Sequence, residues 1–124
     1  MDLLGVPGCS AAFSPAPDGR AQLPFDPVTG VLVPDLWQRW LDWDPVRMVP
    51  GHAEALRSLH SVWIDAGKRD DSSLDLGAQA FHRALLGHDV PADRIRFELF
   101  EAGHGGIDDR YPLSLAWLAR GMSR

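Results

Sequence analysis

The spacing of apolar residues predicts regular elements along most of the chain from residue 34 onward. Residues 34–44 start at a proline, end before Pro45 and repeat large apolar side chains at helical spacing, which predicts a short amphipathic helix. A second short helix is expected over residues 50–59. Residues 60–67 then change to the pattern of a strand that ends at a glycine.

The same pattern predicts a helix and a second strand further along. Residues 74–88 repeat apolar side chains at helical spacing, and residues 95–99 alternate apolar and charged side chains. Strand, helix and strand in succession make a βαβ unit, whose two strands are parallel and end at the same edge of the sheet. Residues 111–122 form a closing helix. In the second strand the expected inward residues are Ile95, Phe97 and Leu99, and the outward ones are Arg96 and Glu98.

The first third of the chain has a different pattern, because prolines and glycines interrupt it too often for long regular elements. We expect at most one short strand between Leu3 and Phe13, followed by an ordered loop. With 124 residues the chain is long enough for one compact domain and too short for two. The sequence therefore predicts a single α/β domain, 1–124, in which a Pro/Gly-rich segment (1–33) precedes a helical and βαβ part (34–124).

Composition and charge exclude several classes of function. A formal net charge of -5 argues against nucleic acid as a partner. The single cysteine, Cys9, cannot form an internal disulfide, and no cysteine or histidine spacing fits a zinc site, so we expect a cytoplasmic protein. The apolar start has no basic residues of a signal peptide, and no stretch reaches the roughly 18 apolar residues of a membrane helix.

Residues able to do chemistry follow the two predicted strands. Asp70 and Asp71 come after the first strand, and His104 comes after the second. Adjacent strands are about 4.8 Å apart, so a carboxylate and an imidazole in these loops can come within hydrogen-bond distance. A carboxylate on one ring nitrogen leaves the other nitrogen free as a general base. The sequence therefore predicts an acid and a base of a catalytic triad.

Three stretches carry a family resemblance: LPFDPVTGVLVPDLWQRWLDWDPVRMV, VWIDAGKRDD and FELFEAGHGGIDDRYPLSLAWLA. They resemble the C-terminal half of bacterial esterases of the esterase D type, which have the α/β-hydrolase fold. The resemblance implies a partial α/β-hydrolase sheet with flanking helices, a small ester as substrate, and neither cofactor nor metal. It also implies Asp70, which follows Gly67 in a G-x-x-D pattern, as the triad acid and His104 as the triad base.

The nucleophile is the missing member of this triad. In the family the serine elbow and the oxyanion loop come before the stretches that this chain matches. The resemblance thus implies the C-terminal portion of a serine esterase that supplies acid and histidine and is inactive alone. The one elbow-like motif, GCSAA, contains Cys9 and Ser10, but Pro15 and Pro17 follow too soon for the helix that an elbow requires.

A second hypothesis is a non-catalytic, self-associating protein. A partial sheet has an open edge, and we expect a homodimer that covers this edge. Positions that are aromatic in relatives hold Ser72, Ser73 and Asp109 here, which suggests engineering or drift of a truncated domain. Acidic loop residues are candidate calcium ligands in this hypothesis. They are Asp70, Asp71, Asp75, Asp108 and Asp109.

Overall fold

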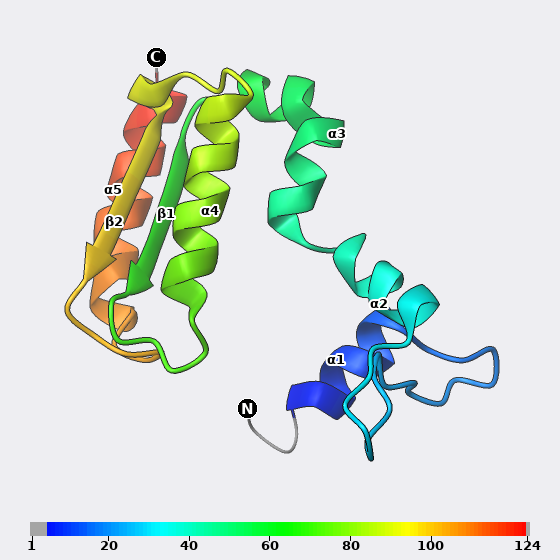
Figure 1. The fold of residues 1–124 in the computed structure, drawn as a ribbon. Coiled ribbons are helices and arrows are strands. Elements are labelled where there is room, and N and C mark those ends of the chain that lie inside the picture. Colours follow the sequence, from blue (N-terminus) through cyan, green and yellow to red (C-terminus); the bar gives the residue numbers. More distant parts are fainter. Residues whose placement is uncertain (1–4, 124) are drawn as a thin grey trace. The chain divides into compact units, whose positions relative to one another are not determined.

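The computed structural model describes residues 5–123, which divide into two compact units, one up to Met48 and one from Val49 onward. The first unit contains helices α1 (Gly5–Phe13) and α2 (Pro34–Leu41). The second contains β1 (Val62–Gly67), α4 (Leu74–Gly87), β2 (Ile95–Phe100) and α5 (Tyr111–Met122). Helix α3 (Pro45–Ser58) crosses the boundary, and the short helices η1 (Ala92–Arg94) and η2 (Asp108–Arg110) precede β2 and α5 (Figure 1).

In the first unit, the prediction of a strand before Phe13 is wrong. Leu3 and Leu4 lie outside the described residues, and Gly5–Phe13 is the helix α1. Pro7 is the third residue of α1, in the first turn, where a helix does not need its backbone N–H. Ala11 and Ala12 then favour helix over strand. A buried polar contact and an aromatic cluster of Phe13, Trp40 and Trp43 hold the first unit together.

That polar contact is centred on Ser14, which is fully buried. Its hydroxyl donates to the carbonyl oxygen of Gln22 over 2.6 Å and accepts from the indole N–H of Trp40 over 2.9 Å. Trp40 also meets the ring of Phe13 edge-on, with ring centres 5.6 Å apart. Trp43 stacks on the same Phe13 ring, with ring centres 6.5 Å apart, although most of its side chain is exposed. Two tryptophans of the predicted helix 34–44 therefore contact α1.

In the second unit, β1 and β2 form a two-stranded parallel sheet with α4 as the connection between them. Every element of the predicted βαβ unit is present, and the mixed α/β class is confirmed. Figure 1 shows α4 and α5 flanking the strand pair. The core lies between α3, α4 and one face of the sheet. It consists of Val49, Leu85 and Val90, with Leu56, Val62, Ile64, Phe81, Ala84 and Ile95 packed around them.

The other face of the sheet is also covered. Trp63 of β1 meets Trp117 of α5 edge-on, with ring centres 6.0 Å apart. The Arg96 and Glu98 side chains, expected to point outward, lie on this second face, where Glu98 is half-buried against Arg110. The alternation of residues along β2 therefore separates an apolar face, packed on α4, from a charged face, packed on α5.

Candidate active site

The candidate site lies in the loops that follow the carboxyl ends of β1 and β2. These loops continue the hydrogen bonding of the sheet: Lys68 N–H donates to the Phe100 carbonyl over 2.9 Å, and Arg69 N–H donates to the Ala102 carbonyl over 3.0 Å. The Lys68 ammonium also pairs with the Glu101 carboxylate. The two loops are thus joined through both backbone and side chains.

Gly67 makes the close approach of these loops possible. A Cβ atom at this position would lie 2.2 Å from the Gly103 carbonyl oxygen and 2.5 Å from the Ala102 carbonyl oxygen. Both distances are far below van der Waals contact, and both partners are backbone atoms that cannot rotate away. A residue with a side chain here would therefore push apart the loops that carry Asp70 and His104.

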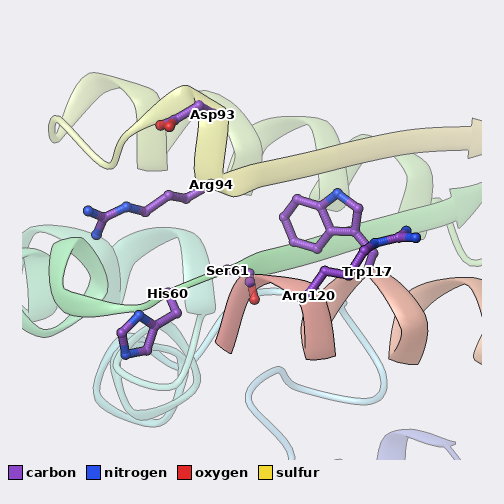
Figure 2. A pocket seen from close by; sticks show the side chains of 7 residues that line it. His60, Ser61, Asp93, Arg94, Trp117 and Arg120 are labelled. Carbon is purple, nitrogen blue, oxygen red and sulfur yellow. The ribbon is translucent and has the colours of Figure 1, made fainter. Parts of the chain in front are cut away.

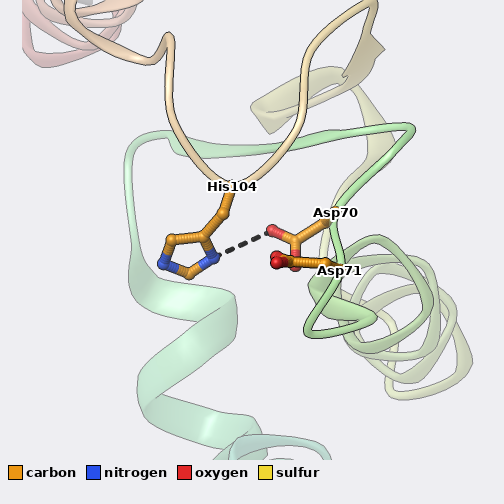
Figure 3. Close-up of side chains that lie close together, drawn as sticks. All are labelled: Asp70, Asp71 and His104. Carbon is orange, nitrogen blue, oxygen red and sulfur yellow. Dashed lines mark hydrogen bonds and ion pairs between the residues drawn. The ribbon is translucent and has the colours of Figure 1, made fainter. Parts of the chain in front are cut away.

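Asp70 is the buried member of the site, with only 4% of its side chain exposed. One carboxylate oxygen accepts the Ser72 N–H over 2.7 Å, and the other lies 3.1 Å from Nδ1 of His104 (Figure 3). Burial by itself would raise the pKa of Asp70, but hydrogen bonds from Ser72, His104 and the Leu74 backbone hold that pKa below its ordinary value. Asp70 is therefore a carboxylate at neutral pH.

His104 is the exposed member, with 63% of its side chain accessible to solvent. In the neutral imidazole, Nδ1–H donates to the Asp70 carboxylate, which leaves the lone pair on Nε2. Figure 3 shows Nε2 directed away from Asp70. A buried carboxylate that fixes the tautomer of an accessible histidine is the arrangement that general base catalysis requires. The structure brings together the two residues that the sequence predicted as acid and base.

The candidate nucleophiles lie in the first unit. Ser10 is in the middle of α1 and not at the start of a helix. Its side chain is fully buried, and within residues 5–123 its hydroxyl has no hydrogen-bond partner. Cys9 is exposed on the same helix. Within residues 5–123 both residues lie inside a helix and neither follows a strand, so the part of the chain described here does not give GCSAA the strand–turn–helix geometry of a nucleophile elbow.

The acidic loops bring fewer groups together than the calcium hypothesis needs. One ligand atom each from Asp70, Asp71 and His104 lies within 4.8 Å of the others, while Asp75, Asp108 and Asp109 are not part of this group. Calcium takes about six to eight oxygen ligands. Two carboxylates and an imidazole nitrogen are a poor match to that coordination.

A partly buried ion cluster anchors the other end of the His104 loop, and the sequence did not reveal it. Arg110 donates through Nε to the Asp65 carboxylate over 2.6 Å and through Nη2 to Glu98. The hydrogen bonds that Arg110 donates to the Asp65 and Glu98 carboxylates raise the pKa of Arg110 against the effect of its burial, and the hydrogen bonds donated by Arg96 and Arg110 lower the pKa of Glu98. Asp65 and Glu98 are paired in the sheet register, so two neighbouring carboxylates share this guanidinium.

The only sequence feature that pointed to this ion cluster was the position of Asp65 and Glu98 in the two predicted strands. Both lie on the same face of adjacent parallel strands, which demands a cation nearby. Nothing in the spacing identified Arg110 as that cation.

In comparisons with known proteins, no family model and no curated protein matches this chain. None of the helices in residues 5–123 has the length and apolar character needed to cross a membrane.

Proposed function

We propose that Asp70 and His104 are the acid and the base of a serine esterase, a hydrolase of carboxylic esters. The observation that carries the proposal is the contact of 3.1 Å between His104 Nδ1 and the buried Asp70 carboxylate. The order along the chain, strand, acid, helix, strand and histidine, agrees with the α/β-hydrolase resemblance. The serine that completes the triad would come from outside the described residues.

In this mechanism Nε2 of His104 removes the proton from the serine hydroxyl as its oxygen attacks the ester carbonyl. Asp70 keeps the imidazole in the required tautomer and stabilises the imidazolium that forms. The imidazolium then donates the same proton to the departing alkoxide, and the acyl group remains on the serine. Water, activated by Nε2, hydrolyses the acyl-enzyme and restores the hydroxyl.

The test uses an activated ester, because an accessible imidazole can promote hydrolysis of such a substrate without a serine. We expect slow hydrolysis of p-nitrophenyl acetate at neutral pH that falls to background in His104→Ala and is several-fold slower in Asp70→Asn. His52→Ala is the matched control, since His52 is an exposed histidine of α3. Equal rates for His104→Ala and His52→Ala would remove the catalytic assignment.

Self-association is the second candidate function, and specific observations favour it. In residues 5–123 each strand has a neighbour on one side only, so both edges of the sheet are open. Several large apolar side chains of α4 and α5 are exposed. They are Leu74, Leu76, Leu86, Tyr111, Leu113, Leu115 and Met122. A homodimer would cover part of this surface.

Light scattering coupled to size exclusion tests this second candidate, with and without calcium. We expect a dimer mass in both conditions, since the dimer needs only the apolar surface. A monomer at every concentration, with calcium present or absent, would remove self-association. A dimer only in calcium would instead support a metal-dependent assembly.

A further inference from the structure

The Asp70–His104 pair has a third neighbour, the Asp71 carboxylate, which the acid–base mechanism does not use. One donor atom each from Asp70, Asp71 and His104 lies within 4.8 Å of the others. Figure 3 shows both carboxylates on the side of the imidazole ring that carries Nδ1. Two oxygen donors and one nitrogen donor that converge in this way are a set that proteins use to hold a divalent metal ion.

The spacing of two of these donors already fits a metal ion. Nδ1 of His104 lies 3.1 Å from the nearer carboxylate oxygen of Asp70. Zinc binds imidazole nitrogen and carboxylate oxygen at about 2.0–2.2 Å, so two neighbouring ligands of one zinc ion lie about 3.0–3.4 Å apart. A zinc ion can therefore take the place of the Nδ1 proton between these two atoms with only a small movement of either side chain.

Asp70 is held in place before any metal binds. Only 4% of its side chain is exposed, and one of its carboxylate oxygens accepts the Ser72 N–H over 2.7 Å. The other oxygen, the one nearer to His104, is then the metal ligand. Backbone hydrogen bonds from Lys68 and Arg69 join the Asp70 loop to the chain that leads to His104. These two donors are therefore preorganised, which lowers the entropic cost of binding.

Asp71 is the donor that can adjust. It is exposed, and within residues 5–123 its carboxylate forms no ion pair, so its rotation toward the other two donors breaks none. The exposed His104 side chain leaves the site open to solvent, so water can complete the coordination, as it does in zinc sites with three protein ligands. Two carboxylates in a chain of net charge -5 also attract a cation.

The opposite end of the sheet does not gather such donors. A cavity of about 480 Å³ at the amino ends of the strands is lined by one histidine and one carboxylate, His60 and Asp93. Figure 2 shows these two side chains well apart, on the chain before β1 and on η1. Among the residues that the structure describes, the one group of at least three potential metal ligands is that of Asp70, Asp71 and His104.

We propose that Asp70, Asp71 and Nδ1 of His104 bind a divalent transition-metal ion of the zinc type. An imidazole ligand favours such ions over calcium and magnesium, which prefer oxygen ligands. The metal takes the Nδ1 lone pair, so the ring loses its proton at Nδ1 and gains one at Nε2, with no net release. Nε2 then has no lone pair, and His104 is no longer a general base. Metal binding is independent of the proposed esterase chemistry, whereas this loss of the base rests on it.

Isothermal titration calorimetry of the whole chain with zinc chloride tests the binding, and calcium chloride is the control ion. We expect one zinc ion per chain, bound at least tenfold more tightly than calcium. Asp71→Asn is the decisive variant, because Asp71 is exposed and its replacement leaves the Asp70–His104 contact in place. It should weaken zinc binding at least tenfold. Asp109→Asn and His52→Ala, which change exposed residues of η2 and α3, should bind zinc within twofold of the unmodified protein.

Nitrogen NMR of His104 at pH 8, where an ordinary imidazole is neutral, shows which ring nitrogen carries the proton. The His104 signals are identified by their loss in His104→Ala. We expect the Nδ1–H form without metal and the Nε2–H form with zinc. Neither measurement uses an ester, so a chain that binds zinc and hydrolyses nothing would refute the esterase and not the metal site. The metal site is overturned if zinc does not saturate, if calcium binds as tightly, if Asp71→Asn binds like Asp109→Asn, or if the Nδ1–H form persists with zinc.

Discussion

Removal of Arg110 should destabilise the second unit in a way that depends on pH. In the protein as it is, Arg110 lies between Asp65 and Glu98, with 15% of its side chain exposed, against 9% for Asp65 and 30% for Glu98. Arg110→Gln leaves two carboxylates opposite each other in the sheet, with Arg96 as the remaining cation beside Glu98. The Asp65 and Glu98 carboxylates then repel each other at a site that is largely shielded from water.

The size of the effect follows from this geometry. Two like charges about 4.8 Å apart repel by about 3.5 kcal/mol at an effective dielectric constant of about 20. Removal of one partner of a fully buried ion pair costs about 3–5 kcal/mol. Because Glu98 is partly exposed and keeps Arg96, we expect a loss of about 2–3 kcal/mol in the free energy of unfolding at pH 7.

The pH dependence separates this explanation from a simple loss of packing. Arg96 and Arg110 keep the pKa of Glu98 low in the unmodified protein, so their contribution to stability is present near neutral pH and is lost as pH falls through that low pKa. In Arg110→Gln the repulsion raises the pKa of Glu98, so protonation relieves the variant as pH falls. The difference between the two proteins should therefore shrink from pH 7 to pH 4.

Urea unfolding at pH 7 and pH 4 measures both quantities, with Arg83→Gln as the charge-matched control. The control should stay within about 0.5 kcal/mol of the unmodified protein, as exposed substitutions usually do. Arg110→Gln combined with Asp65→Asn should recover part of the loss, because one carboxylate of the facing pair is gone. The reasoning fails if Arg110→Gln costs no more than Arg83→Gln, or costs the same at both pH values.

Three further predictions follow from the core and the site. Leu85→Ala removes a fully buried side chain and should lower the free energy of unfolding by about 3–4 kcal/mol in urea titrations; a loss below 1 kcal/mol would contradict the assigned core. Gly67→Ala should lower the free energy of unfolding and separate the two loops, because the new Cβ meets the Gly103 carbonyl. Gly77→Ala, in the open part of α4, should instead raise the free energy of unfolding by about 0.5–1 kcal/mol. Similar stabilities for the two variants would exclude the close approach of the loops at Gly67. The pKa of Asp70 is lowered in the folded protein, so its stabilising effect should be complete above the unfolded pKa of about 3.9 and should disappear as pH falls through the pKa of the folded state. Acid unfolding of Asp70→Asn with the same pH dependence as the unmodified protein would refute this.

The sequence predicted the second unit well because its elements carry strong local signals. The helix expected at 74–88 is α4 (Leu74–Gly87), and the strand expected at 60–67 is β1 (Val62–Gly67). The proximity of Asp70 to His104 was predictable because parallel strands end at one edge, which places their following loops together. The strand ends placed both Asp70 and Asp71 near His104, and the choice of Asp70 as the acid came from the family resemblance.

The parts that the sequence missed depend on contacts between distant residues. Helix α1 was predicted to be a strand because the prolines and glycines of the first third of the chain argued against a longer helix. Pro7, the one proline of α1, lies in the first turn, which tolerates it. The pairing of Arg110 with Asp65 joins residues 45 positions apart, and no local pattern reports such a contact.

The joined loops after β1 and β2 have a consequence for local opening of the protein. The Lys68 amide donates to Phe100, the last residue of β2, and the Arg69 amide donates to Ala102 in the loop that follows, so both amides continue the hydrogen-bonded ladder of the strands. In hydrogen exchange they should be as slow as strand amides, although they lie in loops. Asp70 and His104 would then lose their geometry together, in a single opening event that also breaks the sheet, and not by independent fraying of either loop.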